Sequence, residues 1–443
     1  MSDVLELIAR EEERELKKIG LIPSENHSSP EVLQVLSSCL SSKYSEGYPG
    51  RRHYEGNQLV DELERLAIAR TKELFGVPFA NVQAYSGSPA NSAILFALLD
   101  PGDPLMGLKL DSGGHLTHGH PKITFSGRYF DSVQYGLDAD ARIDFDELSR
   151  LAREHRPKAI IAGTTAYPFE LKFDRFREIA DEVGAWLIAD ISHIAALVVA
   201  GEHPSPFPYC DVVMTTTHKT LRGPRGAVIL VTERGLERDS DLGKKIDRAI
   251  LPGLQGGPHN ATTAAIAIAT DEAMRPQFSE YARRIKRNAS VLASSLLDEG
   301  LSLVGGGTEN HLLLIDLSRQ SARLPEPSPG LGTQVAYAMD VAGMYANRNS
   351  IPNDPSTAFY PSGVRVGSPL VTTRGMGEAE MKQIAAWIGR VVDVVGAERL
   401  PDTRSERITF LRDFKKRAKE DETLIAIRDE VAKVAGGFPL FNW

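Results

Sequence analysis

A lysine that directly follows a β-branched run is the residue of this sequence whose position best suits covalent chemistry. Residues 211–217 are rich in valine and threonine and predict a buried strand, and Lys219 follows where glycine and proline begin to break the pattern. In open α/β sheets, ligands collect at the carboxyl ends of strands. A lysine held there, away from bulk water, can lose its proton and form a Schiff base with an aldehyde cofactor.

Other residues supply what that cofactor needs if it is pyridoxal 5'-phosphate: an acid on the ring nitrogen, a ring stack, a phosphate seat and a cation for the substrate carboxylate. Asp190 ends an apolar run and can hold the protonated ring nitrogen, and His115 in a glycine-rich loop can lie against the ring. Residues 86–88 form a Ser-Gly-Ser turn before an apolar helix, whose first N–H groups can bind a phosphate. The guanidinium of Arg365 can bind both carboxylate oxygens.

Each of these residues also has a simpler interpretation. Lys219 could be a surface lysine, Asp190 a turn cap and Arg365 half of a surface ion pair. The three histidines within residues 111–120 could suggest a metal site, but their spacing is loose and no carboxylate pattern accompanies them, so we expect no metal. The whole set, in this order along an α/β chain, favours the cofactor.

The elements around these residues predict a parallel sheet. Strand-like runs at 158–163 and 185–190 flank a helix that runs from its expected N-cap Asp174 to Val183. Such a β-α-β unit implies parallel strands covered on both faces. Ser88 is predicted as the N-cap of the helix after the Ser-Gly-Ser turn, with Pro89 as the first helical residue.

The predicted fold class is α/β: a large domain with a mostly parallel mixed sheet flanked by helices, a smaller C-terminal α+β domain and an N-terminal helical arm. We place the arm at 1–24, the large cofactor-binding domain at 25–275 and the small domain at 276–443, because Pro276 interrupts a helical pattern at 260–297. The other predicted elements are a helix at 2–19 ending at Gly20, an irregular active-site or interface loop at 43–56, a strand at 311–317, a helix at 334–342, a loop at 347–355, a strand at 363–367 and two closing helices.

The bulk composition is that of an ordinary globular protein. The 443 residues carry a formal net charge of −8, which argues against a nucleic-acid or anionic-membrane partner. The two cysteines, Cys39 and Cys210, indicate no disulfide framework, and we expect both to be buried in a protein of the reducing cytosol. Neither a signal peptide nor a membrane span is predicted, because the longest apolar run, 185–200, is interrupted by polar residues.

Several segments in order along the chain are similar to motifs of one enzyme family. They are residues 24–26, 44–50, 85–91, 113–119, 215–226, 255–258, 349–354 and 362–367. The chain thus resembles the serine hydroxymethyltransferases, cytoplasmic pyridoxal-phosphate enzymes of serine, glycine and one-carbon metabolism. The resemblance implies an aspartate-aminotransferase-like, fold-type I enzyme, a homodimer or tetramer whose active sites are shared between subunits. Its reaction would be the reversible conversion of L-serine and tetrahydrofolate to glycine and 5,10-methylenetetrahydrofolate.

The resemblance also implies roles for individual residues. The implied catalytic residues are Lys219 as the Schiff-base lysine, Asp190 at the ring nitrogen, His115 against the ring, His218 beside it and Glu46 as the proton shuttle. The implied cofactor-binding residues add Thr165 and His193 at the ring, Ser86, Gly87 and Ser88 at the phosphate, and Tyr44 and Gly257 from the neighbouring subunit. The implied substrate-binding residues are Ser24, His193, Arg365 and a neighbouring Tyr54 for the carboxylate, and Leu110, Gly114, Leu116, Asn349 and Phe359 for the folate.

Two other functions compete with this interpretation. One is a folate-independent aldolase or transaldolase acting on other β-hydroxy amino acids, and the other is a non-catalytic binding protein with the same fold. Glu46 and Asn349 favour the folate enzyme, and the presence of both Lys219 and Asp190 disfavours the binding protein. The sequence departs from the family pattern at His53 and Glu55, and also within 167–171 and 357–359, which bears on substrate preference and on the folate contact.

Overall fold

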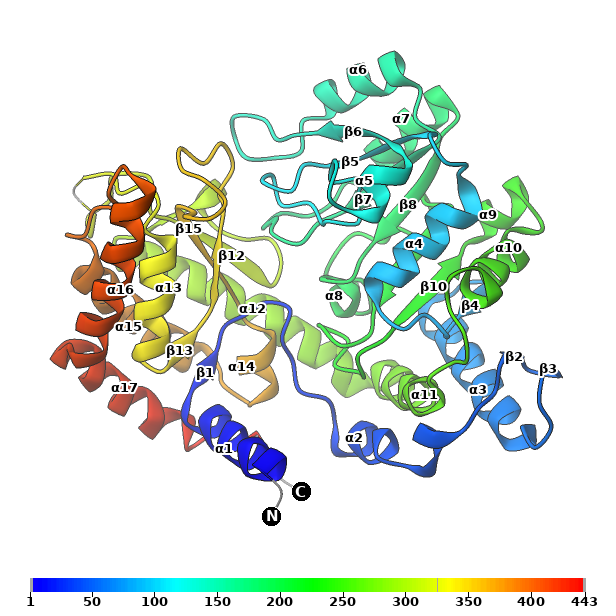
Figure 1. Cartoon of the computed structure of the whole chain (residues 1–443), viewed down its shortest axis with the longest axis horizontal. Coiled ribbons are helices and arrows are strands. Elements are labelled where there is room, and N and C mark those ends of the chain that lie inside the picture. Colours follow the sequence, from blue (N-terminus) through cyan, green and yellow to red (C-terminus); the bar gives the residue numbers. More distant parts are fainter. Residues whose placement is uncertain (1–2, 325, 441–443) are drawn as a thin grey trace. The chain divides into compact units, whose positions relative to one another are not determined.

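The computed structural model describes residues 3–324 and 326–440, and the chain divides into two compact units. The large unit comprises residues 26–165 and 170–283. The small unit draws on residues 1–25, 166–169 and 284–443. Figure 1 shows the helices and strands of both.

A seven-stranded mixed sheet forms the centre of the large unit, in the order β4-β10-β9-β8-β7-β5-β6. Of the seven strands, β10 alone runs opposite in direction to the other six. Every residue of β7, β9 and β10 is buried, as expected for a sheet covered on both faces. The predicted α/β class is therefore confirmed. The strands are β4 (Phe79–Asn81), β5 (Pro104–Leu108), β6 (Asp131–Tyr135), β7 (Ala159–Gly163), β8 (Trp186–Asp190), β9 (Val212–Thr216) and β10 (Ala227–Val231).

The helices of the large unit begin and end close to the predicted residues, with two exceptions at N-termini. The helix between β7 and β8 is capped by Lys172, not by the predicted Asp174. The helix after the Ser-Gly-Ser turn is capped by Ser86, not Ser88. Pro89 therefore lies in the first turn, where it is tolerated because N–H groups at that position have no acceptor within the helix. The helices are α2 (Pro30–Leu36), α3 (Gln58–Phe75), α4 (Gly87–Leu98), α5 (Phe125–Tyr129), α6 (Phe145–His155), α7 (Phe173–Val183), α8 (Ala195–Val199), α9 (Glu233–Arg238), α10 (Leu242–Arg248) and α11 (Asn260–Met274), with short η1 (Cys39–Ser42) and η2 (Ala249–Leu254).

The segment 43–56 is more regular than predicted. β2 (Gly47–Tyr48) and β3 (Arg51–Arg52) pair as a short antiparallel hairpin. Gly50 closes the turn with φ +78°, a left-handed conformation that glycine adopts without steric cost. Cys39 is exposed, contrary to the prediction, whereas Cys210 is buried.

The small unit contains a four-stranded antiparallel sheet, β11-β12-β15-β14, and a two-stranded parallel pair, β1-β13. Three predictions fail here: the N-terminal helix ends at Lys17 because residues 19–20 pair as β1, the predicted loop begins with strand β14, and three helices rather than two close the chain. Pro276 starts a new helix, as predicted. The elements are α1 (Asp3–Lys17), β1 (Ile19–Gly20), α12 (Pro276–Asp298, which begins in the large unit), β11 (Ser302–Leu303), η3 (Val304–Gly306), β12 (Leu312–Asp316), α13 (Gly332–Val341), β13 (Met344–Tyr345), β14 (Asn347–Asn349), β15 (Gly363–Gly367), α14 (Pro369–Thr373), α15 (Glu378–Val395), α16 (Arg404–Glu420) and α17 (Glu422–Ala435).

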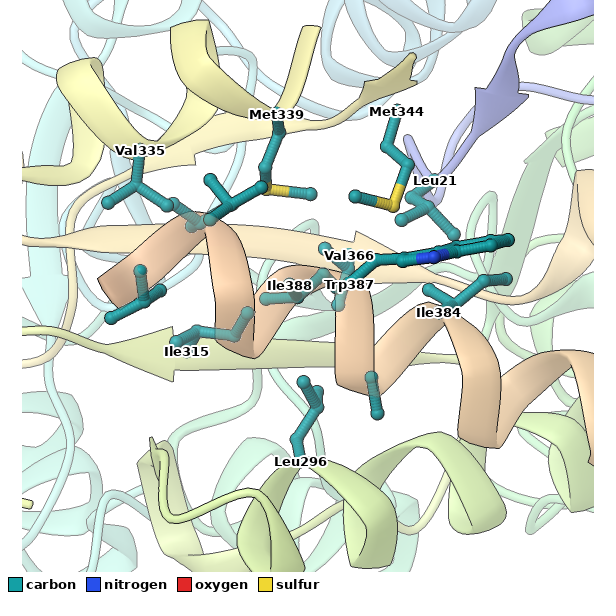
Figure 2. Close-up of a cluster of buried hydrophobic side chains, with 14 of the residues drawn as sticks. Leu21, Leu296, Ile315, Val335, Met339, Met344, Val366, Ile384, Trp387 and Ile388 are labelled. Carbon is teal, nitrogen blue, oxygen red and sulfur yellow. The ribbon is translucent and has the colours of Figure 1, made fainter. Parts of the chain in front are cut away.

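The core of the small unit gathers around Trp387 of α15. Figure 2 shows side chains from α12, α13, α15 and the strands pointing toward one another, and Trp387 is 1% exposed. The indole Nε1 of Trp387 donates to Glu430 of α17 at 2.7 Å, which satisfies its polar atom. Within the part of the chain that the structure describes, no helix has the length and apolarity needed to cross a bilayer.

The buried arginine Arg374 joins the two ends of the small unit. Its guanidinium donates to the carbonyls of Leu16, in the last turn of α1, and of Lys18, just after it. It also donates to the carbonyls of Ala435, the last residue of α17, and of Phe438, just beyond it. These are helix-terminal carbonyls that lack intrahelical partners. A single side chain therefore caps both helices.

Replacing Arg374 by methionine should destabilise the protein, because several carbonyls lose their donor. We expect the free energy of unfolding to fall by about 3 kcal/mol, measured by urea titration of tryptophan fluorescence. Arg412→Met is the control, because that side chain is 75% exposed and, among the described residues, forms an ion pair only with its neighbour Asp413. The control should shift stability by less than about 0.5 kcal/mol, and an equal shift in both variants would contradict the capping role.

Candidate active site

A buried carboxylate lies at the carboxyl end of β8. Asp190 Oδ2 accepts hydrogen bonds from His118 Nε2 and Asn91 Nδ2, both at 3.0 Å, and Asp190 Oδ1 accepts from the backbone N–H of Ser192 at 3.1 Å. Burial alone would raise the pKa of the Asp190 carboxyl, but the hydrogen bond from His118 and the charges of His118 and Lys219 outweigh burial and hold this pKa well below its ordinary value. Asp190 is therefore ionised at neutral pH and can hold a positive charge.

His115 lies close to this carboxylate. The backbone N–H of Thr117 donates to His115 Nδ1 at 3.2 Å, which makes Nδ1 an acceptor; the Thr117 hydroxyl is then the donor in the 2.7 Å contact with Nδ1. Burial, His118 and Lys219 lower the pKa of His115 to about 4. A neutral, flat ring is thus available to stack on an aromatic cofactor.

Lys219 lies in the loop that connects β9 to β10. Its carbonyl accepts hydrogen bonds from Asn26 Nδ2 at 2.9 Å and from the Arg222 N–H at 3.0 Å. Its charge contributes to the shifted pKa values of Asp190, His115 and His218, so the lysine is near all three groups. The pKa of His218 falls to about 4, chiefly because of burial. The structure therefore brings the predicted lysine, aspartate and histidines together in the large unit.

The start of α4 is suited to a phosphate. Ser86 is the N-cap, but its side chain makes no capping hydrogen bond, so the hydroxyl and the first N–H groups can turn to an anion. A Cβ at Gly87 would lie 2.7 Å from Cγ2 of Thr216 at the end of β9, so glycine allows this close approach. The buried hydroxyl of Thr216 has no partner within the described residues.

The loop after β5 carries three of the residues predicted to bind folate. Leu110 and Leu116 are exposed by 41% and 43%. Gly114 lies between them, and a Cβ there would be 2.0 Å from the Leu108 carbonyl. Thr165 fixes this loop, since its hydroxyl donates to the Gly114 carbonyl at 2.8 Å.

A second cluster in the large unit contains Glu46 and two tyrosines. Tyr54 Oη donates to Glu46 Oε2 at 3.2 Å, and the rings of Tyr44 and Tyr54 meet edge to face with centroids 6.3 Å apart. Gly257 adjoins them: a Cβ there would be 3.5 Å from Glu46 Cγ and 3.7 Å from Tyr44 Cδ1. Tyr44, Tyr85 and Gly257 also line a cavity of about 550 Å³.

The remaining predicted residues are distributed between the units. His193 is buried in the large unit, and its carbonyl accepts a hydrogen bond from Thr220 at 3.2 Å. Ser24, Asn349, Phe359 and Arg365 belong to the small unit. Asn347 Oδ1 accepts from Arg365 Nη2 at 2.9 Å, and burial lowers the pKa of this guanidinium to about 10, so it stays charged.

Comparisons with known proteins agree with the resemblance found in the sequence. The family model described as serine hydroxymethyltransferase matches residues 1–388. The chain belongs to the serine hydroxymethyltransferase family. Three similar proteins carry that name: those of Acidothermus cellulolyticus (55% identity, 88% of each chain covered), Sorangium cellulosum (53%, covering 89% of this chain and 90% of the relative) and Desulfotalea psychrophila (50%, 88% of each). Serine hydroxymethyltransferases use pyridoxal phosphate and tetrahydrofolate, so the family and cofactors expected from the sequence are confirmed.

The residues present fit the cofactor of the serine hydroxymethyltransferases. An ionised Asp190 suits a protonated ring nitrogen. The Ser86 hydroxyl, which makes no capping hydrogen bond, and the Thr216 hydroxyl, which has no partner among the described residues, suit a phosphate. Sequence reasoning missed the residues that hold these groups, namely Asn26, Asn91, Thr117, His118 and Thr216. A signal for all five was present, because they lie within segments that resemble family motifs, namely 24–26, 85–91, 113–119 and 215–226.

Proposed function

We propose that this protein interconverts L-serine and tetrahydrofolate with glycine and 5,10-methylenetetrahydrofolate. The observation that carries the proposal is the ionised Asp190, held by His118 and Asn91 beside Lys219 at the strand ends, in a chain of this family. Bound pyridoxal phosphate supplies an electron-accepting ring that makes cleavage of the Cα–Cβ bond of serine feasible.

The chain's own residues then divide the remaining tasks. Lys219 anchors the cofactor, Asp190 keeps the ring nitrogen protonated and His115 supports the ring face. Ser86, Gly87 and Ser88 bind the phosphate. For the amino acid, the two-pronged guanidinium of Arg365 matches the carboxylate.

Glu46 is the residue we propose to move the proton between folate and the hydroxymethyl group. Its side chain is partly buried and accepts a hydrogen bond from Tyr54, which orients the carboxyl group while leaving it accessible. A carboxyl group in such a place can act as a general acid and base.

We further propose a homodimer or tetramer with shared active sites. Tyr44 and Tyr54 are 67% and 47% exposed in the chain, and a surface cluster of tyrosines beside a cavity suits a partner surface. In this arrangement Tyr44, Tyr54 and Gly257 reach the site of the neighbouring subunit.

Domain boundaries and location complete the proposal. The proposed domains are a cofactor-binding domain at 25–275, a small domain at 276–443 and an arm at 1–24. The division of the chain near residues 25 and 283 supports the two larger domains, whereas residues 1–25 group with the small unit. Both cysteines are free thiols, which supports a cytoplasmic location.

The test is glycine formation from serine with and without added tetrahydrofolate. The proposed reaction requires the folate, whereas a folate-independent aldolase or transaldolase would release glycine equally well without it. A rate independent of tetrahydrofolate would overturn the proposal. The names of the relatives disfavour that alternative.

Arg365→Lys tests the carboxylate site. Lysine keeps the charge but cannot bind two oxygens with a rigid planar group, so we expect affinity for glycine to fall by about 10-fold or more. The measurement is glycine titration of the cofactor's visible spectrum. Arg348→Lys, an exposed change on the neighbouring strand β14, is the control and should leave the affinity unchanged. Unaltered affinity in Arg365→Lys would exclude this arginine as the anchor.

A further inference from the structure

Arg52 is a buried arginine whose guanidinium serves several acceptors at once. Its side chain is 4% exposed. Nε donates to Asp61 Oδ1 at 2.8 Å and Nη2 donates to Glu64 Oε2 at 2.6 Å. Both carboxylates lie on α3, so the charge of Arg52 is neutralised by a helix of the rigid large unit.

The remaining bonds of Arg52 lie on either side of Glu46. Nη1 donates to the carbonyl of Ser45 and to the carbonyl of Gly47, each at 2.8 Å. The carbonyls of the two residues that flank Glu46 in the sequence therefore bind to a single nitrogen.

Other hydrogen bonds also hold Ser45 and Gly47, the residues on either side of Glu46. Gln83 Nε2 donates to the Gly47 carbonyl at 3.1 Å and to Glu64 Oε1 at 2.8 Å. The hydroxyl of Ser45, which is 0% exposed, donates to Asn260 Oδ1. By contrast, the side chain of Glu46 is bonded only to the exposed phenol of Tyr54 within the described residues. Its backbone is fixed and its carboxyl end is left accessible.

We propose that Arg52 is a positioning residue for Glu46: by fastening the carbonyls of Ser45 and Gly47 to α3, it fixes where the Glu46 carboxyl group stands during proton transfer. This inference rests on the proposed function, because it assigns Arg52 a role in the step that Glu46 performs. Arginine is suited to the task since its planar group offers five donors in fixed directions. Lysine would keep the charge near the two carboxylates but could not hold both carbonyls in the same geometry.

The test compares Arg52→Lys with Arg65→Lys in the cofactor-loaded enzyme. Arg65 also pairs with Asp61, at 3.5 Å, but is 56% exposed and has no bond to residues 45–47, so it is a matched control. In Arg52→Lys we expect kcat for the folate-dependent conversion of serine to fall by about 10- to 100-fold, because small displacements of a reacting group are costly. The KM for serine and the folate-independent cleavage of a bulkier β-hydroxy amino acid should change by less than about 3-fold, as should every rate of Arg65→Lys.

Two further measurements separate positioning from a loss of structure. Hydrogen exchange in the peptide spanning 44–54 should be faster in Arg52→Lys and unchanged in Arg65→Lys, at equal oligomer mass. The double variant Arg52→Lys/Glu46→Gln should be no slower than Glu46→Gln alone, since Arg52 acts through Glu46. Should Arg52→Lys fail to fold, Gln83→Met removes one donor from the Gly47 carbonyl and should produce the same selective loss at smaller size.

The outcomes are distinguishable. Parallel loss of folate-dependent and folate-independent rates, unchanged exchange in 44–54, or additive losses in the double variant would each overturn the inference about Arg52. A wild-type enzyme that forms glycine without tetrahydrofolate would instead overturn the proposed function, and the inference with it.

Discussion

Lys219→Ala is expected to be colourless and inactive. The visible absorption of pyridoxal phosphate joined to a lysine amine should be absent, and turnover should fall by about 10⁴-fold or more, as when a covalent nucleophile is removed. The loop itself should survive, because Asn26 and Arg222 bind the backbone carbonyl of Lys219, not its side chain. The measurements are the absorption spectrum, the serine-to-glycine rate and the mass by light scattering.

Lys158→Ala is the control for this result. Lys158 is exposed and lies just before β7 in the same large unit, so its loss should leave colour, rate and mass unchanged. A Lys219→Ala protein that remained yellow would refute the assignment of Lys219 as the anchor. A change in mass would show instead that the lysine is needed for assembly.

Glu46→Gln is expected to slow the folate-dependent reaction of the site strongly and to leave its folate-independent reaction nearly unchanged. Glutamine has nearly the same shape and can still accept a hydrogen bond from Tyr54, but it cannot take up or release the proton. Folate-dependent conversion of serine should fall by about 10²- to 10⁴-fold, the range for loss of a general acid or base. Cleavage of a bulkier β-hydroxy amino acid without folate should remain within a few-fold of the wild-type rate.

The neighbouring Glu55→Gln gives the matched comparison. Glu55 is exposed in the same segment and stands where the family commonly has glycine. Its replacement should spare both reactions. Equal loss of both reactions in Glu46→Gln would mean that Glu46 supports the site generally and is not the proton shuttle.

Much of the sheet and the centre of the candidate site followed from local patterns. Apolar runs predicted β7, β8 and β9, and the rule that parallel strands end at the same edge placed Asp190 and Lys219 close to each other. The predicted end of a helix at Val183 was also correct, because the next residue, Gly184, readily adopts the left-handed conformation of a helix C-cap (φ +73°).

The failures arose where long-range contacts decide the structure. The hydrogen bonds from His118 and Asn91 to Asp190 join residues that are 72 and 99 positions apart in the sequence, and no local sequence pattern predicts them. Strands as short as β1 and β14 exist only because a partner strand lies beside them. The wrong prediction for the N-cap of α4 has a local cause. Ser86 and Ser88 are equally good N-cap residues by type, and in the structure the helix begins after Ser86.

The bonds of Arg374 to both α1 and α17 have a consequence for biosynthesis. The ribosome releases α1 well before α17, so the link through Arg374 between the two helices cannot form until α17 has been made. The central sheet of the large unit, by contrast, is complete once β10 has been made. During translation, α1 should therefore reach its full set of contacts only after the central sheet is complete, although it is made before that sheet.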